Sequence, residues 1–410
     1  MSSIDAAPDA SAPRLSRHRP FQLYLGGRAF SRFAAQIGVV ALGWQVYDLT
    51  DSAFYLGMVG LAQFLPMAAL TFLGGHAADR FDRQRVVQVC QIAQGLTAAF
   101  LAWASFEGWI TVHMIFGAVA LLGVTGAFES PAAAALLPGV APEGTLQRAT
   151  ALSTASFQMA VICGPAVGGF AYALGPFVPY GLMTAFWILA SFLNGAIRLE
   201  RPAERREPPR LDQLFAGIAF VRRDPAILGT ISLDLVAVLL GGATALMPIF
   251  ARDILHTGPW GLGMLRAAPA IGALAMTAVL ARHTINKRVG LRMFQAVIVF
   301  GLGTMAFALS TSLWLSLIAL VVMGAADTVS VVIRVSLVQL RTPDEMRGRV
   351  GAVNFLFINA SNQLGEFESG LTAALLGAMP AALIGGIGTV ATALIWMKLF
   401  PTLRRLERLE

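Results

Sequence analysis

The sequence predicts an all-α polytopic membrane protein with twelve transmembrane helices, arranged as two six-helix pseudo-symmetric halves. Its 410 residues are 56% hydrophobic and only 13% charged, whereas about a quarter of the residues in a soluble domain are charged. Apolar stretches of about 20 residues, the length that crosses a bilayer as a helix, recur along the whole chain. A weak internal repeat relates the second half to the first.

The twelve expected spans are joined by short polar connections. The ends of the fourth, fifth, tenth and eleventh spans are hard to place, because Pro131, Pro138, Gln339 and Asn354 lie near them. In chain order, the spans cover residues 22–47, 54–76, 84–104, 109–134, 146–172, 177–197, 226–251, 260–281, 291–309, 313–338, 347–373 and 379–399.

The longest hydrophilic segment, residues 198–225, divides the chain near its middle. Apolar residues at helical spacing within it predict an amphipathic helix along the membrane surface. Across it, at one constant offset, Pro142 matches Pro343 and Arg148 matches Arg349, as a parallel duplication would leave. The expected parts are a disordered cytoplasmic tail (1–20), an N-terminal six-helix half (21–197), a cytoplasmic linker (198–225), a C-terminal six-helix half (226–400) and a second cytoplasmic tail (401–410).

The distribution of charge predicts orientation rather than a nucleic-acid partner. Most of the cations behind the net charge of +7 lie in alternate loops and in both tails, which the positive-inside rule places in the cytoplasm. The histidines are scattered, and the phosphate-binding loop of an ATP-driven pump is missing from the sequence. We therefore expect no enzyme activity, no cofactor and no metal.

The charged hairpin between the second and third spans, Gly74–Arg85, predicts a gate on the cytoplasmic side. In the outward-open state we expect Asp79 to lie near the beginning of span eleven, at 347–350, because a helix N-terminus favours an anion. We expect Arg83 to reach Glu129, near the cytoplasmic end of span four, or another nearby acid; the alternative is that Glu129 is a protonatable site. Gly75 and Arg80 complete the candidate gate.

Two further groups of residues lie in spans one and five. Arg32 and Gln36 are spaced four residues apart, so they share one helix face and could line an aqueous cavity. The run Gly164–Gly169 combines small residues with a proline and predicts close helix packing with a bend. Its candidate packing residues are Gly164, Pro165, Gly168 and Gly169.

The second half carries the carboxylates expected to couple transport to protons. Asp327 near the middle of span ten is the first candidate, ahead of Asp234 and Glu366, because a carboxylate inside a membrane is costly unless it is paired, hydrated or protonated. The alternative for Asp327 is a permanent ion pair with Arg334 on the same helix face.

Span eleven carries a stripe of polar residues at helical spacing. Asn359, Asn362 and Glu366 lie on one face of that helix. Facing lipid, they would leave several polar groups without partners. We therefore expect them to line a central site, together with Arg32, Gln36 and Arg334.

Three stretches of the sequence carry a resemblance to a known family. They are Gly75–Arg83, Ala326–Arg334, and Thr342–Val350 continued by Asn359–Glu366. The first resembles the signature loop of the major facilitator superfamily, with Asp82 in place of the usual glycine. The other two are similar to its enterobactin-exporter-like branch.

That resemblance implies proton-coupled export of a small amphipathic molecule, siderophore-like or drug-like, by alternating access. It also implies a multi-pass protein of the bacterial inner membrane, working as a monomer on a small-molecule substrate with protons and lipid as its other partners. A proton-coupled importer, or less plausibly a transport-inactive sensor, is the alternative.

Overall fold

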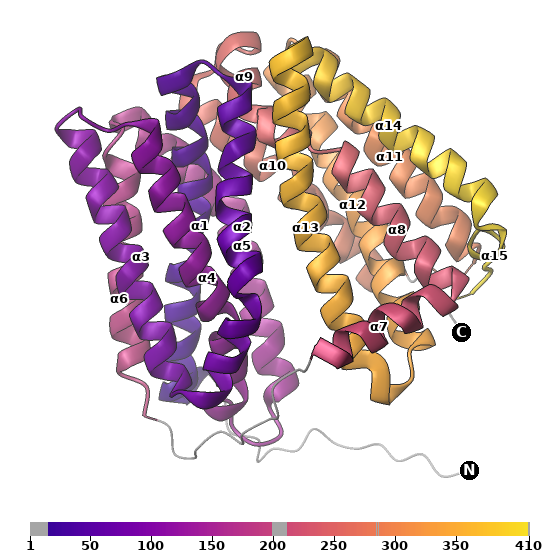
Figure 1. Ribbon diagram of the computed structural model, residues 1–410, viewed down its shortest axis with the longest axis horizontal. Coiled ribbons are helices and arrows are strands. Elements are labelled where there is room, and N and C mark those ends of the chain that lie inside the picture. The colour runs from indigo at the N-terminus through magenta and orange to yellow at the C-terminus, as the bar shows by residue number, and fades with distance from the viewer. Residues whose placement is uncertain (1–14, 199–210, 284, 286, 409–410) are drawn as a thin grey trace.

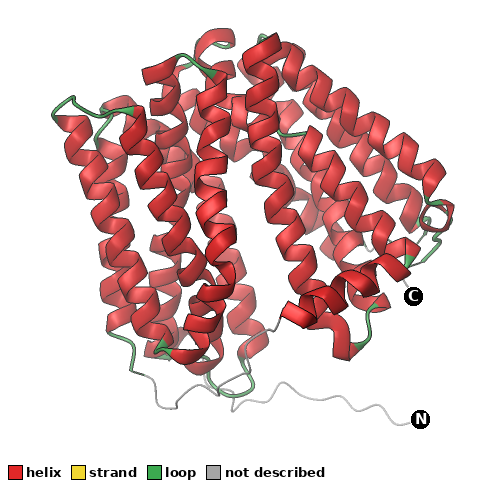
Figure 2. Cartoon of the chain, in the orientation of Figure 1, coloured by secondary structure: helices red, strands yellow, loops and turns green. Residues whose placement is uncertain are grey.

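The computed structural model describes residues 15–408 apart from 199–210, 284 and 286, and these residues are helical nearly throughout (Figures 1 and 2). Ten of the described helical segments are long and apolar enough to cross a membrane. The remaining two spans, α1 and α13, carry charged and amide side chains within their length. Together they make the twelve spans that the sequence predicts.

The N-terminal half contains six long helices in the order expected. They are α1 (Arg19–Thr50), α2 (Ala53–Arg80), α3 (Arg83–Phe106), α4 (Val112–Val140), α5 (Leu146–Leu174) and α6 (Val178–Gly195). Asp82 caps α3, since its side chain accepts a hydrogen bond from the backbone N–H of Gln84 at 2.9 Å. This contact gives the departure from glycine a structural role.

The C-terminal half begins with a short helix, α7 (Leu211–Arg223), and an interrupted seventh span. That span consists of α8 (Pro225–Leu240), η2 (Ala243–Leu246), α9 (Met247–Ile249) and η3 (Phe250–Ile254). The break falls at Gly241 and Gly242. A Cβ added at Gly242 would collide with the backbone of Gly365 in α13, so glycine permits this close approach.

The other five spans of this half are continuous helices. They are α10 (Gly258–Arg282), α11 (Val289–Leu309), α12 (Leu313–Arg341), α13 (Asp344–Leu376) and α14 (Ala378–Leu399), followed by the short α15 (Pro401–Arg404).

The two halves contact each other most extensively through two pairs of helices, α2 with α13 and α5 with α10. Gly57 lies against Gly370, and Gly169 lies against Gly263, because small residues allow helix backbones to approach closely. These four glycines lie toward the end of the helices where α1 ends, which we call the outer end. The ribbons of α2 and α13 diverge toward the opposite, inner end, where α7 lies (Figure 1).

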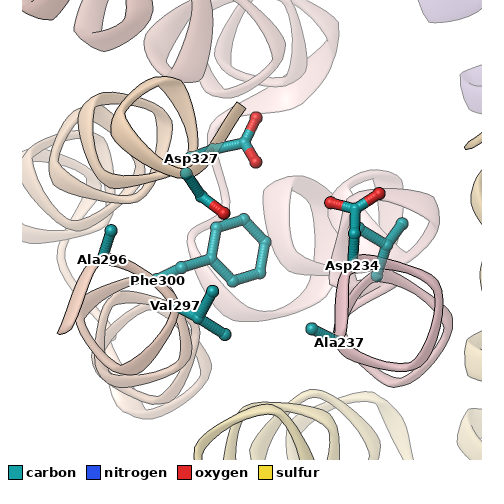
Figure 3. A pocket seen from close by; sticks show the side chains of 8 residues that line it. Asp234, Ala237, Ala296, Val297, Phe300 and Asp327 are labelled. Carbon is teal, nitrogen blue, oxygen red and sulfur yellow. The ribbon is translucent and has the colours of Figure 1, made fainter. Parts of the chain in front are cut away.

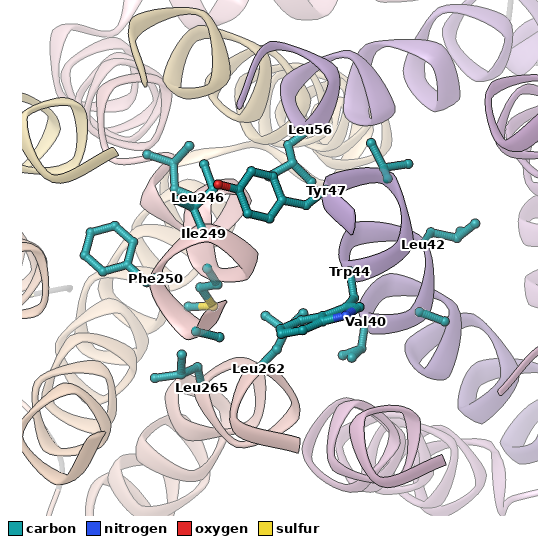
Figure 4. Close-up of a cluster of buried hydrophobic side chains, with 14 of the residues drawn as sticks. Val40, Leu42, Trp44, Tyr47, Leu56, Leu246, Ile249, Phe250, Leu262 and Leu265 are labelled. Atoms are coloured by element: carbon teal, nitrogen blue, oxygen red, sulfur yellow. The ribbon is translucent and has the colours of Figure 1, made fainter. Parts of the chain in front are cut away.

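A cluster of buried apolar side chains fills the outer end between the halves. It joins Trp44 of α1 to Leu246, Phe250 and Leu262 of the second half (Figure 4). Burying side chains of this size stabilises their contact by about 1.5–3 kcal/mol each. The outer end is therefore closed by packing as well as by polar contacts.

Parts of the expected tails form helices or pack on the protein, and the expected linker contains the helix α7. Residues 15–17 form a short 3-10 helix, η1 (Leu15–Arg17), and α1 begins at Arg19, so only 1–14 of the expected tail lies outside the described residues. At the other terminus Leu403 is fully buried, and the Leu406 carbonyl accepts from Gly290 N–H at 3.0 Å. In α7, Val221 is buried in a cluster with Val350 of α13, so this helix packs on protein.

Candidate functional site

Polar contacts at the outer end join α1 to the last segment of span seven. The Tyr47 hydroxyl donates a hydrogen bond to Asp253. Arg252 forms an ion pair with Asp51 at 2.9 Å, donates to the Tyr47 carbonyl at 3.4 Å and lies 5.2 Å above the Tyr47 ring. We call Tyr47, Asp51, Arg252 and Asp253 the outer latch. Sequence reasoning missed it, although the isolated Arg252 on a side otherwise lacking cations was a usable signal.

Loosening the outer latch should expose the outer end. In Arg252→Gln the ion pair and the ring contact are lost. Since Asp51 is largely exposed, we expect the free energy of opening the outer end to fall by about 1 kcal/mol. A cysteine introduced at Ala243, which is buried, should then react about five-fold faster with a membrane-impermeant thiol reagent added at the outer side. Cys90 and Cys163 are replaced beforehand.

The matched control for this experiment is Arg85→Gln. Arg85 is exposed at the inner end and pairs with Asp82 at 3.7 Å, so it should leave the labelling rate unchanged. Equal labelling rates in Arg252→Gln and in the parent protein would show that the outer latch does not stabilise the closed outer end.

Glu129 lies in a neutral polar cluster rather than in the expected ion pair with Arg83. Its carboxylate accepts from Ser31 Oγ at 2.8 Å, Gln91 Nε2 at 3.0 Å and Gln94 Nε2 at 3.0 Å. The reason is the length of α4, which continues to Val140. Glu129 therefore lies about 16 Å from that end of the helix, deeper than the sequence suggested.

Arg83 binds backbone carbonyls near the inner end, and its expected contact with another nearby acid stays a prediction. Its Nε donates to the Ala78 carbonyl at 3.2 Å and its Nη1 to that of Ala135 at 3.3 Å. It thereby ties the beginning of α3 to the ends of α2 and α4. Among the described residues, the remaining gate candidates form no hydrogen bond or ion pair with α13.

Those remaining candidates lie on the last turns of α2. Asp79 is half-buried, Arg80 is exposed and Gly75 has open space on its Cβ side. The contact of Asp79 with 347–350 was expected for the outward-open state. Because the halves here meet at the outer end, that contact stays a prediction.

The glycines of α5 lie at contacts with both halves. Gly164 faces the side chain of Gln36, while a Cβ at Gly168 would lie 2.9 Å from the Ile37 carbonyl oxygen. Gly169 faces α10, and Pro165 is buried within the same stretch. Gln36 therefore packs against α5.

Arg32 lies one turn closer to the inner end than Gln36. It is half-buried, and its guanidinium carbon lies 5.6 Å from the ring centroid of Phe157 in α5. This distance is within cation–π range.

The first-ranked carboxylate, Asp327, has no hydrogen-bond or ion-pair partner among the residues that the structure describes. It lines a cavity of about 20 Å³ between α8, α11 and α12, with Asp234 and Ser330 as its other polar lining residues (Figure 3). A cavity of this size holds about one water molecule. The Phe300 ring extends from α11 and lies to one side of the two carboxylates (Figure 3).

The expected alternative for Asp327, an ion pair with Arg334, is wrong. Arg334 pairs with Asp234 on α8, and its side chain is only 5% exposed. Asp327 and Arg334 share a helix face, but their offset of seven residues separates their backbones by about 10 Å. The facing helix offers Arg334 a closer partner.

The polar stripe of α13 is packed against α2 at one end and exposed further along. Glu366 is half-buried, and a Cβ added to Gly60 of α2 would lie 2.9 Å from its Oε2. One turn toward the inner end Asn362 is exposed, and Asn359 is half-buried. The stripe thus begins at the contact between α2 and α13 and continues to where these helices diverge.

The comparisons with known proteins agree with this architecture. A family model described as Major Facilitator Superfamily matches residues 25–366. The multidrug efflux pump Tap of Mycobacterium tuberculosis is 28% identical over 415 residues, covering 96% of each chain. The enterobactin exporter EntS of Citrobacter koseri is 27% identical over 409 residues, covering 96% of this chain and 95% of its own.

Solved structures show the same fold at low sequence identity. A bacterial homolog of the human lysosomal transporter Spinster, in an inward-facing and unoccupied conformation, has a TM-score of 0.72 at 13% identity, covering 95% of this chain and 96% of its own. The nucleoside transporter NupG reaches 0.72 at 16% identity, covering 93% of this chain and all of its own. With the family model spanning most of the sequence, this chain belongs to the major facilitator superfamily and is a membrane transporter rather than an enzyme.

Proposed function

We propose that this transporter exports a small amphipathic molecule from a bacterial cell by alternating access, in exchange for protons. Two relatives that align with nearly the whole chain are named as exporters, which supports the direction. The observation that carries proton coupling is the unpartnered Asp327 in a water-sized cavity. The protein works as a monomer in the inner membrane, with both termini in the cytoplasm, as the positive-inside rule favours.

Asp327 is the group that takes up and releases the proton. A charged carboxylate inside the membrane costs free energy unless it is paired or hydrated, and Asp327 lacks a protein partner. Its neighbour Asp234 is already held by Arg334. The division of roles follows, since Asp234 is fixed as a charged partner while Asp327 is left to exchange its proton with water in the cavity.

Proton uptake acts on the outer end through span seven. Asp234 lies on α8, and the same span ends in the segment that holds Arg252 and Asp253. A change of charge at Asp327 alters the field at the Asp234–Arg334 pair and shifts α8 along its axis without rotating it, so that the ion pair is kept while the outer segment moves. The inner gate, formed by Gly75, Asp79, Arg80 and Arg83, closes when the outer latch opens.

The transported molecule occupies the space between the halves. Arg32, Gln36, Asn359 and Asn362 contribute polar groups to it from α1 and α13, and Glu366 lies where α2 and α13 meet. Glu129 supports Arg32 electrostatically from α4. Few fixed charges among apolar helices suit an amphipathic substrate.

Transport into proteoliposomes with known protein orientation tests this proposal. A pH gradient is imposed and a panel of fluorescent amphipathic dyes is followed. Exchange for protons requires a dye to accumulate on the acidic side. Accumulation on the alkaline side would establish the alternative, a proton-coupled importer, and no gradient-dependent movement of any dye would contradict coupling.

A further inference from the structure

Arg266 of α10 is a buried cation that the mechanism above does not use. Its side chain is half-buried, and its Nε is inaccessible to solvent without a hydrogen-bond partner. Among the described residues no carboxylate lies within ion-pair distance of it. Glu366 acts on it only electrostatically, from α13. A guanidinium at this depth is therefore neutralised only from a distance.

Such a guanidinium is costly to keep in a membrane protein. Arg side chains inside membranes pair with carboxylates, with backbone carbonyls or with groups in an aqueous space. Arg334 shows the usual solution in this chain, a direct pair with Asp234. Arg266 lacks such a pair, so it retains the capacity to bind an anion.

Arg266 lies beside one of the two main contacts between the halves. It lies one turn beyond Gly263, the residue through which α10 contacts α5. Glu366 occupies the matching position in the other contact, against Gly60 of α2. Arg266 therefore lies about one turn inward of the Gly169–Gly263 contact, and Glu366 lies about one turn inward of the Gly57–Gly370 contact.

We propose that Arg266 binds the anionic group of the transported molecule, which then compensates its charge directly where Glu366 does so only from a distance. This inference rests on the proposed transport function and names its substrate class, an organic anion with an apolar body. The planar guanidinium matches a carboxylate with two parallel hydrogen bonds. Glu366 is a weaker candidate for binding a cationic group of a ligand, because its carboxylate already packs against α2.

Binding of three benzene derivatives of the same shape tests the proposal on the purified full-length protein in detergent. Benzoate carries the negative charge, benzamide is neutral and benzamidine is positive. We expect calorimetry and thermal stabilisation to show benzoate binding most tightly. Arg266→Gln should weaken benzoate on the order of ten-fold, since a charge-assisted hydrogen bond is lost, and should leave benzamide unchanged.

A second variant gives the opposite sign and does not depend on Arg266→Gln folding. Glu366→Gln removes the carboxylate that competes for Arg266, so benzoate should bind several-fold more tightly. Arg266→Lys should retain part of the affinity. A purely structural role for the two residues would not produce opposite effects on one ligand.

Three outcomes would overturn the proposal. They are benzoate affinity that is unaffected by Arg266→Gln, a preference for benzamidine that Glu366→Gln abolishes, and no benzoate binding by the wild type up to its solubility limit. Because binding is measured without a proton gradient, failure here leaves proton-driven transport standing, and failure of transport leaves anion binding standing.

Discussion

Asp327→Asn is expected to abolish uphill transport in proteoliposomes with a pH gradient while leaving downhill exchange of substrate intact. The amide has the size of the protonated carboxyl group but cannot release a proton. The carrier can therefore still alternate with substrate bound, whereas the gradient no longer drives accumulation. We expect accumulation to fall at least about ten-fold, the loss that corresponds to about 1.4 kcal/mol of driving force.

Ser330→Ala is the matched control for this prediction. Ser330 lines the same cavity and carries no titratable proton, so uphill transport should persist. Undiminished accumulation by Asp327→Asn would place the coupling carboxylate elsewhere, with Glu366 as the next candidate.

The second large effect is expected on stability, at the Asp234–Arg334 pair. Arg334→Gln leaves the Asp234 carboxylate buried without its partner, which typically costs about 3–5 kcal/mol. We expect a marked fall in the thermal unfolding temperature of the purified protein. The double variant Asp234→Asn/Arg334→Gln removes both charges and should recover most of that loss.

Arg341→Gln provides the reference for this cycle. Arg341 also pairs with an aspartate, Asp224 at 3.6 Å, but its side chain is 40% exposed, so the change should cost about 1 kcal/mol or less. If the single and double variants at positions 234 and 334 unfolded at the same temperature, the pair would not act as a unit.

Hydropathy and charge were sufficient to predict the helices and their order, because the bilayer fixes both their length and their composition. They were insufficient for partners across helices. Glu129 was expected to meet Arg83 because Pro131 suggested an early end to span four, yet α4 continues to Val140. Proline inside a membrane helix is tolerated when neighbours satisfy the freed backbone groups.

The polar pairs that matter most join residues far apart in the sequence. The helical spacing of residues in span ten does not indicate whether Arg334 pairs with Asp327 on its own helix or with Asp234 on another. The choice depends on how α8 faces α12. The outer latch likewise depends on η3, a π-helical turn that turns Arg252 and Asp253 toward α1. Such turns are rare, so hydropathy alone does not reveal them.

The interruption of span seven at Gly241 and Gly242 gives its two ends separate freedom of rotation. In an unbroken helix, turning Arg252 and Asp253 away from α1 would also turn Asp234 away from Arg334. Glycines at the break absorb changes in backbone dihedral angles, so the outer segment can tilt while α8 keeps its orientation. The rotation of the outer segment is then taken up at Gly241 and Gly242, so the ion pair between Asp234 and Arg334 stays intact throughout the transport cycle.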